Sequence, residues 1–242
     1  MSEKIYTIPV NDAFSSECEC PICAMYSQLE NNSIEYTMGP SYMEDDVRSE
    51  TDKLGFCAPH IKMIYNQENR LGMAWVMKTH FDKTVHDISK LQKKPLIQPS
   101  LFKKNDEKSA LLDYLNTLNN SCFVCNRVKN VFERYIDTIF VLWENDQSFR
   151  EKYKSCKGFC SPHYELLLKA ATTKLKNKSF NEFVEITNNL YLENMARVRD
   201  DLAWFINKFD YKYKDEPWLN AKDSLIRSAT KTNSIIDISE KK

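Results

Sequence analysis

Apolar side chains recur at helical spacing along most of this chain of 242 residues. Ile61, Ile64, Leu71 and Trp75, for example, lie three, seven and four residues apart, which places them on one face of a helix. Residues 1–19 and those after about 230 lack this pattern and are expected to be irregular. The pattern predicts an all-α protein with helices over residues 21–37, 42–53, 58–91, 106–118, 123–144, 161–177 and 180–210, and a last short helix that ends near residue 229.

Glycine, proline and capping residues predict where some of these helices begin and end. Gly39 and Pro40 end the first helix, and Gly55 is expected to take the positive φ of a helix-ending turn. Ser179 lies three residues before Glu182, which predicts a capping box at the start of the last long helix.

The two halves of the chain share one motif, which indicates an internal duplication. The spans from its second to its third cysteine are 34 and 35 residues. Between the halves, residues 93–105 contain two prolines and interrupt the helical pattern, which predicts a linker. We therefore expect helical domains over 1–99 and 100–230, and a flexible tail over 231–242. The motif reads Cys20-Pro21-Ile22-Cys23 with Gly55-Phe56-Cys57-Ala58-Pro59-His60, and then Cys122-Phe123-Val124-Cys125 with Gly158-Phe159-Cys160-Ser161-Pro162-His163.

Three thiolates and one imidazole in each copy suit a tetrahedral zinc ion with all four positions filled by protein. Each Cys-x-x-His element is expected at a helix N-terminus, where unpaired N–H groups and the helix dipole favour a thiolate. The similar spacing in both copies predicts that each ion is bound within its own half, because exchanged pairing would close loops of about 100 residues. The predicted ligands are Cys20, Cys23, Cys57 and His60 for one zinc ion, and Cys122, Cys125, Cys160 and His163 for the other.

Other chemistry for these residues stays open. An iron–sulfur cluster is the main alternative, although cluster ligation mostly uses cysteine or paired histidines. Buried reduced cysteines are a further alternative, and thiol oxidoreduction would leave His60 and His163 unexplained. Cys18 and Cys156 have no counterpart in the other copy, so we interpret both as free cysteines.

Charge and composition narrow the function classes. Lys plus Arg equals Asp plus Glu at 34 each, so no global basic field favours nucleic acid as a partner. The chain has four glycines, which argues against a dinucleotide fingerprint, a P-loop or a nucleophile elbow. It shows no apolar export or membrane-spanning segment. Eight cysteines in such a chain favour metal ligation over disulfides and predict a cytoplasmic protein.

The acidic stretch over residues 39–48 is where the first copy of the repeat departs from the second. Its Gly39-Pro40 turn aligns with helical residues in the second copy, and Glu44, Asp46 and Arg48 follow. A duplicated chain that diverges locally can acquire a site there. A solvated turn at the start of a helix explains the same residues.

Taken together, these motifs resemble an uncharacterised bacterial family of cytosolic proteins with a domain of unknown function. The resemblance covers about residues 18–225 and includes Lys208-Phe209-Asp210-Tyr211 and Asp215-Glu216-Pro217-Trp218. It implies an all-helical protein with metal ligands at the eight motif positions, and it implies no activity.

The sequence therefore favours a non-catalytic zinc protein, in which two structural sites support a helical scaffold for an unknown protein or small-molecule partner. The alternative is an iron–sulfur redox protein, or an enzyme with a site near residues 39–48. No catalytic residue and no oligomeric state can be named from the sequence.

Overall fold

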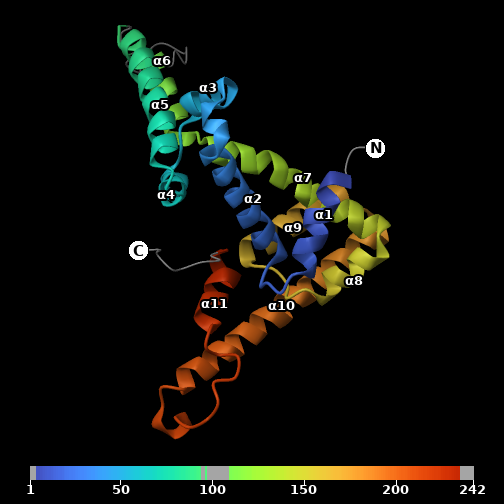
Figure 1. Ribbon diagram of the computed structural model, residues 1–242. Coiled ribbons are helices and arrows are strands. Elements are labelled where there is room, and N and C mark those ends of the chain that lie inside the picture. The colour runs from blue at the N-terminus through green and yellow to red at the C-terminus, as the bar shows by residue number, and fades with distance from the viewer. Residues whose placement is uncertain (1–3, 94–95, 97–108, 235–242) are drawn as a thin grey trace, which may run out of the picture. The chain divides into compact units, whose positions relative to one another are not determined.

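The computed structural model describes residues 4–93, 96 and 109–234 and is all-helical over them, without a strand (Figure 1). None of the helices in these ranges is long and apolar enough to cross a membrane. Most of the predicted linker and residues 235–242 of the predicted tail lie outside the described residues. The helices are α1 (Lys4–Ser15), α2 (Pro21–Met38), η1 (Pro40–Met43), α3 (Asp45–Leu54), α4 (Ala58–Asn66), α5 (Arg70–Leu91), α6 (Ala110–Asn120), α7 (Phe123–Asn145), α8 (Gln147–Ser155), α9 (Ser161–Lys174), α10 (Asn177–Asn207), η2 (Tyr211–Tyr213) and α11 (Ser224–Asn233), where η marks a 3₁₀-helix.

Most predicted helices are present, and the differences have local causes. The helix expected over 58–91 is two helices, because Glu68 adopts φ 61° and Asn69 starts a new helix by accepting a hydrogen bond from the Gly72 amide. The capping box is absent, since α10 already begins at Asn177 and Ser179 Oγ has no hydrogen-bond partner in the described chain.

Two further helices lie where none was predicted. Residues 4–15 form α1 although they include Pro9, and α8 follows α7 directly. Both carry apolar residues that are completely or almost completely buried, among them Val10 and Phe14 of α1 and Phe149 and Tyr153 of α8. Packing of α1 against α8 therefore supplies stability that the short local patterns do not reveal.

Contacts divide the chain into two units that do not coincide with the expected domains. Unit 1 comprises Met1–Gln28 and Val131–Lys242, and unit 2 comprises Leu29–Asn130. Both α2 and α7 begin in one unit and end in the other. The division into helical domains over 1–99 and 100–230 stays a prediction.

The core of unit 1 is rich in aromatic residues. Trp143, Tyr153, Phe159 and Phe183 are fully buried, and their rings contact one another at centroid distances between 5.1 and 5.3 Å. The Tyr153 hydroxyl shares a hydrogen bond of 2.8 Å with Thr187 Oγ1. α10 packs against α9 and α11 (Figure 1). Phe159 directly precedes Cys160, so this core adjoins the second copy of the repeated cysteine motif.

Unit 2 has a smaller core. Its buried residues include Ile34 of α2, Ile64 of α4, Val76 of α5 and Val124 of α7, each with no exposed surface. α3 and η1 pack against α5, and α4 and α6 also contact α5. The core of unit 2 thus supports both helix starts that carry its cysteines.

Two candidate metal centres

The structure gathers the eight predicted ligands into two groups, and it pairs them across the halves of the sequence. In each group, all four ligand atoms lie within 4.8 Å of one another. The prediction that each half forms its own site is wrong, because every Cys-x-x-Cys pair faces the Cys-x-x-His pair of the other half. Centre 1 consists of Cys20, Cys23, Cys160 and His163, and centre 2 consists of Cys57, His60, Cys122 and Cys125.

Centre 1 lies within unit 1, between the starts of α2 and α9. Cys20 precedes α2 and Cys23 is in its first turn, while Cys160 is the N-cap of α9 and His163 follows one turn later. Cys160 Sγ lies 3.8 Å from Cys20 Sγ and 3.5 Å from Cys23 Sγ. His163 Nδ1 lies 3.6, 3.3 and 3.1 Å from the sulfurs of Cys20, Cys23 and Cys160.

Centre 2 lies within unit 2 and joins the starts of α4 and α7 in the same manner. Cys57 is the N-cap of α4, and His60 is in its first turn. Cys57 Sγ and Cys125 Sγ are 3.8 Å apart. His60 Nδ1 lies 3.1 Å from Cys57 Sγ, 3.2 Å from Cys122 Sγ and 3.4 Å from Cys125 Sγ.

These distances match a tetrahedron around one small ion. With Zn–S bonds of about 2.3 Å and a Zn–N bond of about 2.0 Å, tetrahedral angles place two sulfurs about 3.8 Å apart and a sulfur and a nitrogen about 3.5 Å apart. The sulfur–sulfur separations of 3.5–3.8 Å and the sulfur–nitrogen separations of 3.1–3.6 Å lie close to both values. The donor set and its spacing therefore fit a metal ion.

Exchanged pairing follows from the stiffness of the helices between the motifs. α2 has 18 residues and carries the chain about 27 Å from Cys20, whereas the 4 residues of η1 and the 10 residues of α3 together span about 23 Å. In the second half, the 23 residues of α7 span about 34 Å and the 9 residues of α8 about 14 Å. The entropic preference for the shorter loop is only about 1 kcal/mol, and it applies to flexible chains. The direction of the rigid helices therefore outweighs this entropic preference.

A glycine with positive φ precedes the Cys-x-x-His element of each centre. Gly55 and Gly158 adopt φ values of 57° and 72°, which L-residues with a side chain rarely take. Each glycine lies two residues before the cysteine that caps α4 or α9. The positive φ expected at Gly55 is therefore confirmed. At Gly158 a Cβ atom would also lie 2.6 Å from the backbone oxygen of Leu190.

The electrostatics of the clustered thiols call for a cation. Burial raises the pKa of the Cys20 thiol well above its ordinary value, and its sulfur neighbours add to the shift. Burial and the neighbouring Cys122 sulfur raise the pKa of Cys125 to about 12. Against the effect of burial, hydrogen bonds to Cys122 and Glu30 raise the pKa of His60 to about 10. Three thiolates within 4.8 Å of one another repel, so all three cysteines of a centre ionise together only when a positive charge lies among them.

Centre 2 has an acidic partner behind its histidine. His60 is buried, and its Nε2 atom lies 2.9 Å from Glu30 Oε1 while Nδ1 faces the sulfurs. Glu30 belongs to α2, so the helix that begins at centre 1 contributes to centre 2 after crossing into unit 2. Carboxylates in this position orient a metal-binding imidazole and raise its basicity.

Centre 1 is instead covered by the end of α11. Lys231 has 1% of its side chain exposed, and its Nζ donates to the backbone oxygens of Glu19, at 2.6 Å, and Lys157. The same Nζ lies 3.2 Å from the Glu19 carboxylate, which Arg197 also contacts at 2.5 Å. Burial lowers the pKa of Lys231, and the Glu19 carboxylate opposes that shift. One ammonium group therefore binds the segments that precede both helix starts of centre 1.

Other residues from the sequence analysis lie elsewhere. Cys18 and Cys156 belong to neither group. In the stretch 39–48, Asp45 and Arg48 of α3 form an ion pair of 2.9 Å. They line a pocket of about 300 Å³ together with Ser49, Asp52 and Thr79.

Sequence reasoning missed Glu30 and Lys231. Glu30 lies in a helix with a regular polar pattern, and Lys231 falls in what was expected to be a solvated tail. Lys231 lies seven residues after Ser224, where α11 begins, and the amphipathic pattern of this segment was the one signal for a helix. No local signal indicated that its side chain is buried.

Comparison with known proteins identifies the family of the chain. Searches of curated proteins and of solved structures found no match to this chain. Residues 1–239 match a family described as "Family of unknown function (DUF6062)". The match covers both candidate metal centres, and the chain therefore belongs to the DUF6062 family.

Proposed function

We propose that this protein binds two zinc ions in structural Cys3His sites and serves as a non-catalytic binding or scaffold protein. The observation that carries the proposal is the tetrahedral arrangement of three sulfurs and one imidazole nitrogen in each centre. Four protein ligands leave zinc no open position for water or substrate, which is typical of structural sites.

Zinc is favoured over an iron–sulfur cluster by the separations of the sulfurs. Cys160 Sγ lies 3.5 Å from Cys23 Sγ and 3.8 Å from Cys20 Sγ, so the three sulfurs surround a space for a single ion. A cluster distributes its cysteines over different iron atoms and needs wider separations. The imidazole ligand in each centre also suits zinc.

Each ion would hold together segments that are distant in sequence. At centre 1 it joins residues near 20 to residues near 160, and at centre 2 it joins the starts of α4 and α7. Zinc binding contributes about 10–16 kcal/mol in zinc-finger peptides, which exceeds the entropic cost of closing either loop. Metal binding and folding of each unit would then share one free energy.

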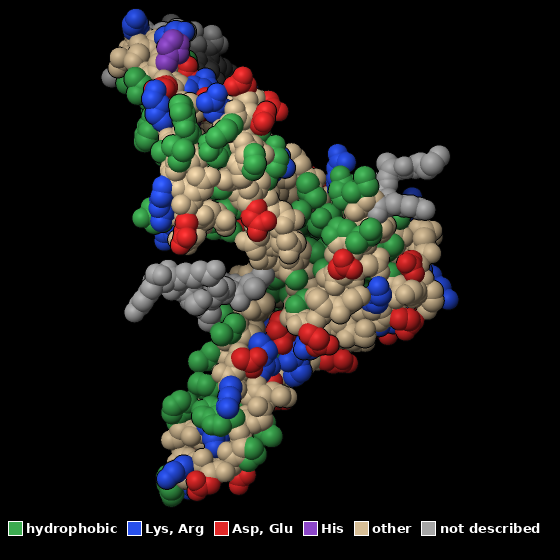
Figure 2. Space-filling view, in the orientation of Figure 1, with side chains coloured by type: hydrophobic (Ala, Val, Ile, Leu, Met, Phe, Trp, Pro, Cys, Tyr) green, Lys and Arg blue, Asp and Glu red, His purple; other side chains and the backbone are tan. Residues whose placement is uncertain are grey.

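The end of α10 and the loop after it support the proposed binding role. Ile206, Phe209, Tyr211 and Leu219 are 68–83% exposed, and Figure 2 shows hydrophobic side chains on this part of unit 1. Apolar side chains gathered on an exposed surface are typical of interaction sites.

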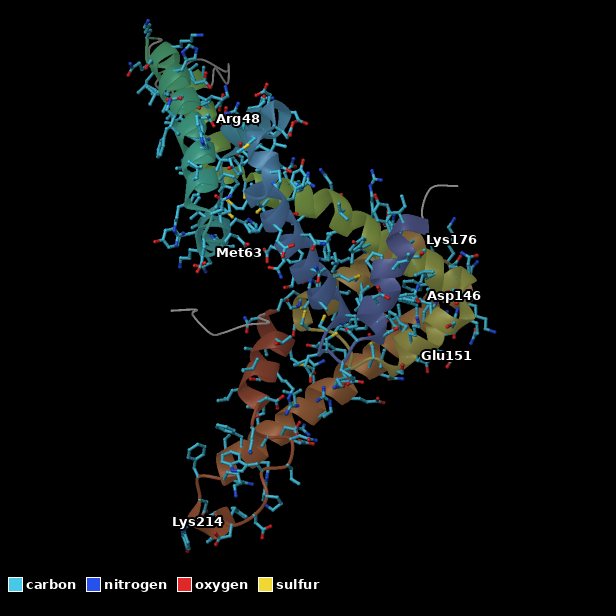
Figure 3. The ribbon with its side chains drawn as sticks, viewed as in Figure 1. Arg48, Met63, Asp146, Glu151, Lys176 and Lys214 are labelled. Atoms are coloured by element: carbon cyan, nitrogen blue, oxygen red, sulfur yellow. The ribbon has the colours of Figure 1, made fainter. Side chains whose placement is uncertain are left out.

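This loop is nevertheless held in place. Lys208 Nζ donates to the backbone oxygens of Tyr213, Lys214 and Glu216, and it lies 5.5 Å from the centre of the Trp218 ring. Lys214 lies at the far end of the loop (Figure 3). An ordered loop presents apolar side chains to a partner at a lower entropic cost than a flexible one.

A second candidate function is an enzyme or small-molecule site near residues 39–48. Asp52 Oδ1, in the pocket beside Arg48, is buried and has no hydrogen-bond partner among the described residues. A ligand with an amine or hydroxyl donor would satisfy it. The five lining residues include no cysteine or histidine, and Arg48 is already paired with Asp45, so this candidate has weaker support.

Elemental analysis of protein purified without oxygen tests the main proposal. We expect two zinc ions per chain, a colourless protein, and loss of helical circular dichroism when a strong chelator removes the metal. Iron with inorganic sulfide would support the redox alternative instead. A metal-free protein with full helical content would contradict a structural role.

A further inference from the structure

The two centres differ in their access to solvent, and this inference rests on the zinc sites proposed above. In centre 1 the three cysteines have between 0% and 3% of their surface exposed. In centre 2 Cys122 is 6% exposed, Cys57 is partly exposed and Cys125 is exposed. Centre 2 therefore presents two of its three cysteines to solvent.

Centre 1 is enclosed by contacts from the end of α11, and the part of the chain that the structure describes shows no equivalent contacts at Cys125. Ser234 Oγ, just after α11, lies 3.0 Å from Cys160 Sγ. Lys231 binds the backbone on both sides of the centre, and Ser161 Oγ donates to the Lys231 carbonyl at 3.3 Å. These contacts close the way from solvent to the centre 1 sulfurs.

The sulfurs of the two accessible cysteines of centre 2 also lie close together. Cys57 Sγ and Cys125 Sγ are 3.8 Å apart, although the residues are 68 positions apart in sequence. A disulfide needs a sulfur–sulfur distance of about 2 Å, so closure requires the two sulfurs to move less than 2 Å closer together as they leave the ion. Cys57 lies at the very start of α4, where the preceding loop can accommodate such a shift.

We propose that Cys125 is a site of oxidation by hydroperoxides, that Cys57 resolves it as a disulfide, and that this step releases the zinc ion of centre 2 alone. Zinc-bound cysteines are thiolates, and exposed thiolates are the sulfurs that peroxides oxidise first. Release would free the start of α4 from the start of α7 without affecting centre 1. The zinc ion of centre 2 then acts as a redox-sensitive crosslink between these two helix starts of unit 2.

The chemistry balances with one peroxide per centre. The Cys125 thiolate attacks a peroxide oxygen, an S–O bond forms, the O–O bond breaks, and the leaving oxygen takes a proton from solvent. The Cys57 thiolate then attacks the sulfenic sulfur, the S–S bond forms, and the S–O oxygen leaves as water after taking a second proton. Two thiolates lose two electrons, the peroxide gains them, and zinc keeps only Cys122 and His60.

Hydrogen peroxide added to the zinc-loaded full chain tests this proposal, with released zinc followed by a chromophoric chelator. We expect one of the two ions to leave at least ten times faster than the other. Peptide mapping without reductant should show a Cys57–Cys125 disulfide, and dithiothreitol with zinc should restore two ions per chain.

Two variants sharpen the test. Cys125→His keeps a zinc ligand but removes the reactive sulfur, so it should hold two ions and lose the fast phase. A Cys18→Ser/Cys156→Ser variant, altered only outside both centres, should keep the fast phase. Equal release of both ions, no release, or a disulfide between other cysteines would overturn the proposal. A chain that contains no zinc before peroxide is added would overturn the proposed function itself.

Discussion

Cys23 and Cys160 are 137 residues apart in sequence, and their Sγ atoms lie 3.5 Å apart. This contact joins the first motif of the chain to the last, and it lies within unit 1, which consists of two separate segments. Metal at centre 1 would therefore fasten the N-terminal segment to the C-terminal half. Because the contact pairs ligands from different halves of the sequence, substitutions can test which residues share an ion.

Pairs of ligand substitutions should reveal the exchanged pairing. Cys20→Ser combined with His163→Ala damages centre 1 alone and should remove one zinc ion per chain. Cys20→Ser combined with His60→Ala damages both centres and should remove two. Elemental analysis of the soluble protein measures both values. The opposite result, two ions lost in the first variant and one in the second, would show that each half binds its own ion.

Loss of the carboxylate behind His60 should weaken centre 2 selectively. Glu30→Ala removes the acceptor at 2.9 Å from His60 Nε2, and partners of this kind typically change metal affinity 10–100-fold. Competition with a chelator of known affinity should show weaker binding of one ion and unchanged binding of the other. Glu35→Ala, at an exposed position of the same helix, is the control. Equal effects of both substitutions would contradict a role for Glu30.

Removal of the buried ammonium should destabilise unit 1. Lys231→Met leaves the Glu19 carboxylate and two backbone oxygens without their buried donor, and breaking a buried ion pair costs about 3–5 kcal/mol. Arg197 still contacts Glu19, so we expect about 3 kcal/mol, the lower end of that range. Denaturant unfolding measures the change. Lys222→Met, at an exposed position, should leave the unfolding midpoint unchanged.

The two motif glycines should differ in their tolerance of alanine. Both have positive φ, so each substitution costs about 1–3 kcal/mol in backbone strain. At Gly158 the new Cβ would also lie 2.6 Å from the Leu190 backbone oxygen, whereas at Gly55 it would meet the His80 side chain at 2.8 Å. Because a side chain moves more easily than a helix backbone, Gly158→Ala should lower the unfolding midpoint further. A larger loss for Gly55→Ala would contradict this reasoning.

The sequence by itself determined the helical class of the chain and which eight residues gather in the two centres. Local physics explains this success, since helical spacing of apolar residues reports the buried face of each helix. The Cys-x-x-Cys and Cys-x-x-His spacings likewise place two ligands within one helical turn. Helix bounds over α7, from 123 to 145, follow the pattern within one residue.

Only the tertiary structure decided which pair of cysteines meets which histidine. Cys23 lies 34 residues before Cys57 in sequence, yet it faces Cys160, because the stiff helix α2 carries the chain about 27 Å away from Cys20. Glu30 and Lys231 acquire their places at the centres through the same arrangement. A sequence pattern reports contacts within a turn of helix, whereas the direction of a long helix sets contacts between distant segments, and packing of whole helices determines that direction.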